Sequence, residues 1–284
     1  MRSILATALA VFSVSALNAC ATRTVGTTAA ESRAASRMGG TIESTDRRLG
    51  AALLVESLLP TAESHLQVAR EYARLGILDV AHSRTEKALK QNPQLAAGHD
   101  MMARIWRDWG MPGTALGHAH RALFYEPDAA GVHNTLGTIL HALGKVDEAR
   151  GAFLKAFELD PSAGWALSNL CYLEFRQGSF DEARRRCEAA VAASPALATA
   201  YNNLGLTHAA SGDLASASEA FQAGGDVAAG YYNLGIVHMA AGRYVEAGRA
   251  FQRAIDSRPA FTAAKTRAHE ARMRALGADD RRQP

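Results

Sequence analysis

The sequence predicts an all-α protein built from about six helix-turn-helix repeats, and three observations support this prediction. Prolines recur every 34 residues, at Pro93, Pro127, Pro161 and Pro195. Glycines and alanines keep the same step, at Gly76, Gly110, Gly144, Gly178 and Gly212 and at Ala81, Ala115, Ala149, Ala183 and Ala217. Alanine is abundant and aromatic residues are only 7%, a balance that suits closely packed helices. A fixed period of this length indicates stacked supersecondary units.

Each repeat is predicted to be two antiparallel helices joined by a turn. The glycine ends the first helix. The proline closes the repeat, because it cannot continue the second helix but can begin a new one. The repeats begin near Ala62, Ala96, Ala130, Gly164, Ala198 and Ala228. The fifth repeat is four residues short and has Gly224-Gly225 in place of a closing proline, so we expect a bend or a looser joint there.

Small residues in the middle of the first helix let the two helices of a repeat approach closely. They form the pairs Leu136-Gly137, Leu204-Gly205 and Leu234-Gly235, with Val68-Ala69, Met102-Ala103 and Leu170-Cys171 as variants. With this pattern, residues 61–259 resemble tetratricopeptide repeats, a resemblance that implies an α-solenoid. Helices over 48–60 and 260–276 are expected to cap the two ends, and 277–284 to form a loose tail.

The first residues indicate export and a lipid anchor. The apolar run from Ile4 to Leu17 is too short to span a bilayer, so residues 1–19 are interpreted as a signal peptide. The sequence Leu17-Asn18-Ala19-Cys20 resembles the lipobox of bacterial lipoproteins, which implies lipidation of Cys20; the alternative is an ordinary secretory signal with an accidental cysteine. By resemblance to the sorting rule of enteric bacteria, Ala21 rather than Asp at the second mature position implies the periplasmic face of the outer membrane, although other lineages follow other rules. Residues 20–47 are expected to form the lipidated N-terminus and a flexible tether.

Composition and motifs argue against several function classes. The net charge of +3 and the absence of a dense Lys/Arg block do not suggest a nucleic-acid partner. The sequence has no zinc-hydrolase motif, phosphate-binding loop or nucleophile turn. We therefore predict that the protein is not an enzyme and has no cofactor, small-molecule substrate or metal. Three of its ten histidines, His65, His99 and His133, are one repeat apart and are expected to fill the seam between helices.

Cys171 and Cys187 occupy the eighth and twenty-fourth places of the fourth repeat. A hairpin folded about Gly178 and Ser179 brings these places nearly opposite each other, so a disulfide is sterically plausible in an exported protein. The alternative is two reduced cysteines that serve as small buried residues. The sequence leaves both open.

The resemblance also implies that the first helices line a concave face that contacts a peptide. An asparagine ladder there, Asn134, Asn169, Asn202, Asn203 and Asn233, can bond an extended backbone, since an amide both donates and accepts; its alternative role is local structure. Aromatic residues around it are Trp165, Tyr172, Phe175 and Tyr232. Arginines fall at nearby places, Arg70, Arg74, Arg104, Arg107 and Arg176, and the alternative for them is ordinary solvated surface. We expect a partner segment with acidic and apolar residues.

These features predict a lipid-anchored periplasmic scaffold that binds a protein or an extended peptide segment. In plan, the chain resembles the tetratricopeptide lipoproteins of type IV pilus biogenesis, which implies help in assembling an outer-membrane secretin or positioning another envelope protein. One alternative is an adaptor that regulates peptidoglycan hydrolases or proteases. Another is a subunit of a polysaccharide-export or outer-membrane-protein assembly complex.

Overall fold

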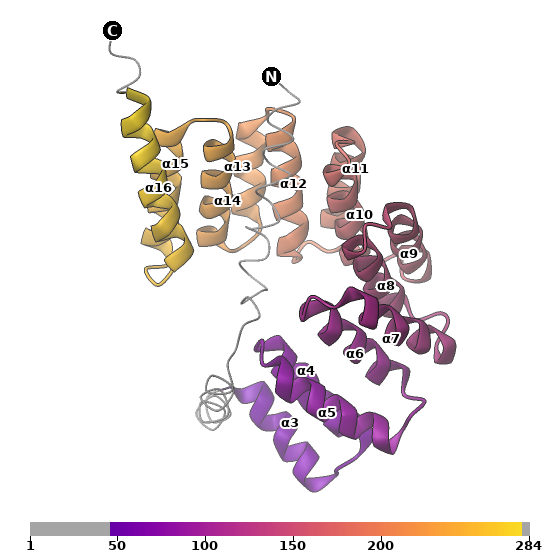
Figure 1. Cartoon of the computed structure of the whole chain (residues 1–284). Helices are drawn as coiled ribbons and strands as arrows, with labels where there is room; N and C mark the ends of the chain where they lie inside the picture. The colour runs from indigo at the N-terminus through magenta and orange to yellow at the C-terminus, as the bar shows by residue number, and fades with distance from the viewer. Residues whose placement is uncertain (1–45, 280–284) are drawn as a thin grey trace. The chain divides into compact units, whose positions relative to one another are not determined.

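A computed structural model describes residues 46–279 of the chain (Figure 1). Within this range the chain forms fourteen α-helices, α3 to α16, and no β-strand. The predicted signal peptide, Cys20 and nearly all of the predicted tether lie outside the described residues, as do the last five residues. None of the helices within the described range is both long and apolar enough to cross a membrane.

Twelve of these helices form six pairs, and each pair begins within one residue of a predicted repeat start. The pairs are α4 (Ala62–Arg74) and α5 (Leu78–Gln91), α6 (Ala96–Asp108) and α7 (Pro112–Tyr125), α8 (Ala130–Ala142) and α9 (Val146–Leu159), α10 (Gly164–Arg176) and α11 (Phe180–Ala193), α12 (Ala198–Ala210) and α13 (Leu214–Ala223), and α14 (Val227–Ala240) and α15 (Tyr244–Ser257). Two more helices flank them, α3 (Arg47–Leu58) and α16 (Thr262–Asp279).

The flanking helices differ slightly from their predicted ranges. Helix α3 ends at Leu58, two residues before the expected end of the first cap. Helix α16 continues to Asp279, so the expectation of a loose tail from residue 277 is wrong for its first three residues. Helix α3 packs on α4, and α16 packs on α15.

The turn inside each repeat is closed by a glycine with a positive φ. Gly144 has φ 76°; its N–H donates to the carbonyl of His141 at 3.0 Å, and the next N–H, of Lys145, donates to that of Leu140 at 2.9 Å. These bonds satisfy carbonyls at the end of α8 that have no partner within the helix. Glycine suits this position because a Cβ disfavours the left-handed backbone.

The described residues divide into two compact units, and the boundary falls between Leu159 and Asp160. The N-terminal unit contains α3 to α9, and the C-terminal unit contains α10 to α16. In the N-terminal unit α6 contacts both α4 and α8, and in the C-terminal unit α12 contacts both α10 and α14. Within each unit, therefore, the first helices of successive repeats lie next to one another.

The two helices of each repeat cross at its eighth and twenty-fourth residues, here called the crossing pair. In the third repeat it is Gly137 and Phe153, and a Cβ added to Gly137 would lie 2.5 Å from the Phe153 ring. Glycine is therefore required where phenylalanine stands opposite. The fifth and sixth repeats repeat this arrangement with Gly205 and Phe221 and with Gly235 and Phe251. The first two repeats use the buried pairs Ala69 and Thr85, and Ala103 and Ala119.

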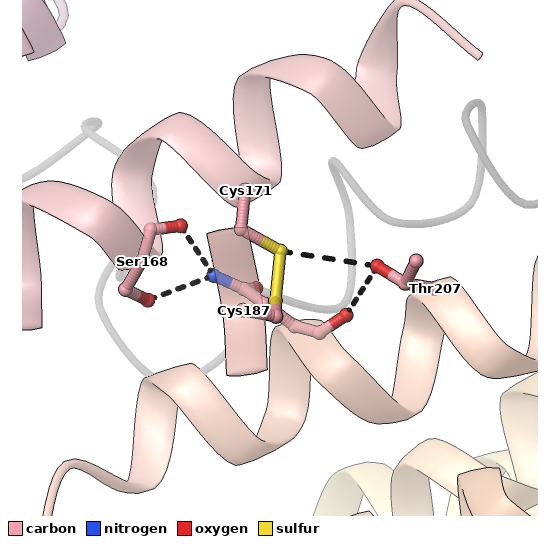
Figure 2. The surroundings of a disulfide bond; sticks show 5 residues. Ser168, Cys171, Cys187 and Thr207 are labelled. Carbon is pink, nitrogen blue, oxygen red and sulfur yellow. Dashed lines mark hydrogen bonds between the residues drawn. A yellow bond between two sulfur atoms is a disulfide. The ribbon is translucent and has the colours of Figure 1, made fainter. Parts of the chain in front are cut away.

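In the fourth repeat the crossing pair is Cys171 and Cys187, and the structure has the disulfide between them (Figure 2). Their Cα atoms are 5.2 Å apart, within the usual range for a disulfide. Both cysteines are fully buried, in a core cluster with Phe175 and Phe221. Of the two alternatives that the sequence left open, the structure contains the bonded one. The bridge joins α10 to α11 where other repeats use a ring against a glycine.

The shortened fifth repeat is closed by specific polar contacts. Its second helix, α13, has 10 residues, and Gly225 follows it with φ 80°. Asp226 caps α14 by accepting from the N–H of Ala229 at 3.0 Å. One Nη of Arg258, at the end of α15, donates to both carboxylate oxygens of Asp226 at 2.7 and 2.6 Å. The joint that the sequence suggested to be loose is thus held by a cap and an ion pair.

The role of the crossing pair can be tested by replacing the two cysteines of the fourth repeat with the glycine and phenylalanine that other repeats have there. The free energy of unfolding of Cys171→Gly with Cys187→Phe should exceed that of Cys171→Ser with Cys187→Ser by about 2 kcal/mol, because the phenylalanine ring fills the apolar volume that the two serines leave. Both variants lose the bridge, which contributes about 3 kcal/mol. Urea unfolding followed by circular dichroism measures the difference. Equal stability of the two variants would show that the fourth repeat does not share the packing of its neighbours.

Candidate peptide-binding surface

The candidate surface consists of the first helices of the repeats. In the N-terminal unit it is formed by α4, α6 and α8, and in the C-terminal unit by α10, α12 and α14. The predicted contact residues Arg70, Arg74, Arg104, Arg107 and Asn134 belong to the first set, and the others belong to the second.

Two arginines of the N-terminal unit reach from α6 to α8. Arg104 donates through Nε to the hydroxyl of Thr135 at 3.2 Å, and Arg107 donates through Nη1 to that of Thr138 at 2.9 Å. Each bond joins residues 31 apart in the sequence, so it connects neighbouring repeats. The sequence analysis missed both threonines, which lie on the next first helix, three residues short of the 34-residue step from their arginines.

The N-terminal unit is less basic than the sequence suggested. Arg104 forms an ion pair with Asp100 at 2.9 Å, and Arg107 with Asp108 at 2.7 Å. Arg74 is paired as well, with Asp46 and Glu71. Arg70 is exposed, and within residues 46–279 it has no ion pair. This surface therefore presents positioned guanidinium groups beside carboxylates rather than a field of uncompensated positive charge. Asn134 is half-buried on α8.

The asparagines of the C-terminal unit have different roles. Asn203 is only 8% exposed, and its Nδ2 donates to the backbone carbonyl of Ser168 at 3.0 Å and to its hydroxyl at 3.1 Å. These bonds join α12 to α10 beside the disulfide (Figure 2). Asn203 therefore has a structural role, which the sequence analysis gave as the alternative to peptide binding. Asn202 and Asn169 are half-buried, and Nδ2 of Asn233 donates to Oδ1 of Asn202 at 3.2 Å, which joins α14 to α12.

Two of the four predicted aromatic contacts are core residues. Phe175 is 4% exposed and lies in the cluster around the disulfide. Tyr232 is 6% exposed and packs between Phe251 and Phe261, with ring centroids at 5.6 and 5.0 Å. The expectation that these two rings contact a partner is therefore wrong, because the neighbouring helices cover them.

Five side chains of the C-terminal unit combine partial exposure with binding chemistry. Trp165 and Tyr172 are half-buried, and Arg176 donates to the Tyr172 hydroxyl at 3.4 Å. The bond between Asn233 and Asn202 uses one N–H of Asn233 and the Oδ1 of Asn202. The pair therefore leaves the N–H groups of Asn202 and the Oδ1 of Asn233 unused. A peptide backbone requires one donor and one acceptor of this kind. The arrangement suits an extended segment that carries an apolar or acidic side chain.

The recurring histidines bond to the ends of the preceding repeats. Nε2 of His99 lies 3.0 Å from the carbonyl of Pro93, and Nε2 of His133 lies 2.8 Å from that of Pro127. A carbonyl only accepts, so Nε2 is the protonated nitrogen in both. His65 instead contacts Glu56, with Nδ1 and Oε1 2.6 Å apart. Within residues 46–279 no three His, Cys, Asp or Glu side chains are grouped as metal ligands.

His99 and His118 lie close together in the N-terminal unit, with ring centroids 5.9 Å apart. Their Nδ1 atoms are buried and have no hydrogen-bond partner. Burial lowers the pKa of both, and the proximity of His99, Arg121 and His82 lowers the pKa of His118 further, because a second positive charge there would be repelled. Burial also lowers the pKa of His238 in the C-terminal unit. These rings are therefore neutral in the folded protein at neutral pH.

This predicts a loss of stability on mild acidification. The unfolded chain, with an ordinary histidine pKa near 6.5, takes up protons at a higher pH than the folded chain, so stability falls as the pH drops below that value. The Tm should decrease between pH 7.5 and pH 5.5. His118→Ala, which places at this position the alanine of the third repeat, should reduce the decrease, whereas His120→Ala, an exposed position on the same helix, should not. An identical decrease in both variants would contradict the assignment.

The assignment of Asn203 gives a second prediction. Asn203→Ala should lower the free energy of unfolding by about 1–3 kcal/mol, because the buried hydroxyl and carbonyl of Ser168 lose their donor. Asn202→Ala, at the next residue of the same helix, removes a half-buried amide and should cost less. Urea unfolding of both variants provides the comparison. If Asn203→Ala costs no more than Asn202→Ala, the bonds to Ser168 do not stabilise the stack.

Comparison with known proteins agrees with this architecture. Family profiles described as tetratricopeptide repeat match residues 162–224 and, separately, 130–163 and 228–261. No curated protein sequence matches the chain. The chain therefore contains tetratricopeptide repeats over these residues, and its helix pairs at the 34-residue step give it a solenoid-like fold of that kind.

Three solved structures with the same fold differ in how much of their own length this chain covers. The crystal structure of the APC/C hetero-tetramer Cut9–Hcn1 superposes with a TM-score of 0.64 at 16% identity over 78% of this chain, which spans only 45% of that one. The structure of PilW, described as a widely conserved type IV pilus biogenesis factor, gives 0.60 at 24% identity over 72% of this chain and 97% of that one. Pseudomonas aeruginosa PilF gives 0.56 at 16% identity, over 75% and 96%. This fold is typical of non-catalytic scaffolds for protein interactions.

Proposed function

We propose that the protein is a lipid-anchored periplasmic scaffold that binds protein partners to assemble or position an envelope machine, most specifically the secretin of a type IV pilus. The observation that carries this proposal is the extent of the structural likeness. The chain superposes on nearly the full length of PilW and PilF, 97% and 96% of those chains. The lipobox-like sequence that ends at Cys20 supplies the anchor.

The partner is proposed to be an extended segment bound in part by the C-terminal unit. Asn202 and Asn233 supply amide groups that already bond each other across two repeats, so their positions are constrained before a ligand arrives. Tyr172 and Arg176 on α10 supply an aromatic surface and a cation joined by a hydrogen bond. Preorganised groups of this kind lose little conformational entropy on binding.

The first experiment is mild crosslinking of the anchored protein in its own bacterium, followed by affinity purification and mass spectrometry. Cys20→Ala should move the protein from the membrane to the soluble fraction. The wild-type protein should recover a secretin or other pilus components. Tyr172→Ala with Asn233→Ala should reduce that recovery several-fold while circular dichroism still shows the folded helix content, because both side chains are half-buried on the candidate surface.

Glu188→Ala, an exposed change on the second helix α11, is the matched control and should leave recovery unchanged. Retention of the Cys20→Ala protein on membranes would contradict the anchor. Recovery of peptidoglycan hydrolases or proteases instead would replace the pilus assignment with the adaptor. Recovery of export or outer-membrane-protein assembly subunits would replace it with the third alternative.

A further inference from the structure

Helix α3 has two apolar faces, and only one of them is covered. Its inner face packs on the first repeat through Leu49 and Ala52, which are 0% and 5% exposed. Its outer face carries a second apolar set at the helical spacing i, i+3, i+4 and i+7: Ala51, Leu54, Val55 and Leu58. The last three are 61%, 51% and 71% exposed. A helix that is apolar all round is normally buried on every side, so the outer face is expected to have an occupant.

The fold holds this outer face in place. The Asp46 carboxylate caps α3 by accepting from two of its N–H groups, and it also accepts from Arg74 on α4. Near the other end, Glu56 is buried between His65 at 2.6 Å and Arg84 at 2.7 Å. Contacts at both ends fix the rotation of α3 about its axis. The apolar stripe therefore stays exposed in the folded protein and cannot turn toward the first repeat.

Charge distinguishes the candidate occupants. Arg47 and Arg48, at the start of α3, are exposed beside the apolar stripe. The only carboxylate within the helix is Glu56, which is buried and already paired. A second copy docking through the same face would therefore bring arginines and apolar side chains but no carboxylate of α3. A bilayer with anionic headgroups supplies both an apolar boundary for the leucines and phosphates for the arginines.

The position of α3 along the chain agrees with a lipid surface. Residues 21–46, which are 26 in number, separate Cys20 from α3. A chain of that length reaches at most about 90 Å when fully extended. An acyl chain at Cys20 would therefore keep α3 within reach of the membrane and at a high effective concentration beside it.

We propose that the outer face of α3 binds the anionic membrane surface to which Cys20 anchors the chain, with Leu54, Val55 and Leu58 at the acyl boundary and Arg47 and Arg48 at the phosphates. The inference rests on the proposed lipid anchor. It adds a second attachment, which holds the first repeat against the bilayer and limits the rotation that a single tether would allow.

The test places a nitroxide on the lipidated full-length protein at Leu58→Cys, bound to vesicles of phosphatidylethanolamine and phosphatidylglycerol. Ser83→Cys, an exposed position on α5, carries the same label as the matched control. Electron paramagnetic resonance measures collision of the label with oxygen, which enters the acyl region, and with a water-soluble nickel complex, which does not. The ratio of oxygen to nickel collisions at Leu58 should rise several-fold on vesicle binding, while that at Ser83 stays constant. Leu54→Cys should repeat the result.

Vesicle flotation separates failure of the inference from failure of the anchor. Flotation of the wild-type protein with an unchanged collision ratio at both Leu58 and Leu54 would overturn the proposal and leave the anchor standing. If the wild-type protein does not float with the vesicles, the proposed lipid anchor is wrong, and so is the inference that rests on it. Dipolar broadening between labels at Leu58 would show that a second copy covers the face, which also overturns the proposal.

Discussion

The packing of each repeat depends on how closely its two helices approach at the crossing pair. Where the second helix carries phenylalanine, as at Phe153, the first helix must carry glycine, because even a Cβ at Gly137 would overlap the ring. Where both residues are small, as at Ala103 and Ala119, they are fully buried without a ring between them. The disulfide of the fourth repeat occupies the same place with a covalent link. One steric constraint thus has three chemical solutions within a single chain.

Polar bonds between first helices then connect successive repeats. Arg104 reaches Thr135, Asn203 reaches Ser168, and the amide of Asn233 reaches the preceding first helix, over separations of 31 to 35 residues. These contacts use residue types that are also suited to peptide recognition. Asn203 donates both of its bonds to Ser168 within the stack and is only 8% exposed, so it offers little to a partner. A side chain that is half-buried and partly satisfied is held in position and keeps binding capacity.

Much of the fold could be predicted from the sequence, but less of the candidate surface. The period of 34, the turn glycines such as Gly144 and the shortened fifth repeat are properties of residue order, so they were predictable. The burial of Phe175 and Tyr232 depends on which neighbouring helix covers each ring, and no single repeat reveals that. The pairing of Arg104 with Asp100 was missed for a related reason, since arginines counted by place give no information about adjacent carboxylates.

In the flanking helices α3 and α16, covering the end of the repeat stack accounts only for the face that packs on the adjacent repeat. On α16 the exposed residues are mixed, because polar residues such as Lys265 stand beside Met273 and Leu276, which are 56% and 64% exposed. On α3 the exposed apolar residues, among them Leu54 and Leu58, lie on one face at helical spacing. The inner faces of both helices complete the adjacent core, so core formation does not account for these exposed apolar residues. The continuous stripe on α3 is the stronger case for contact with something outside the repeat stack.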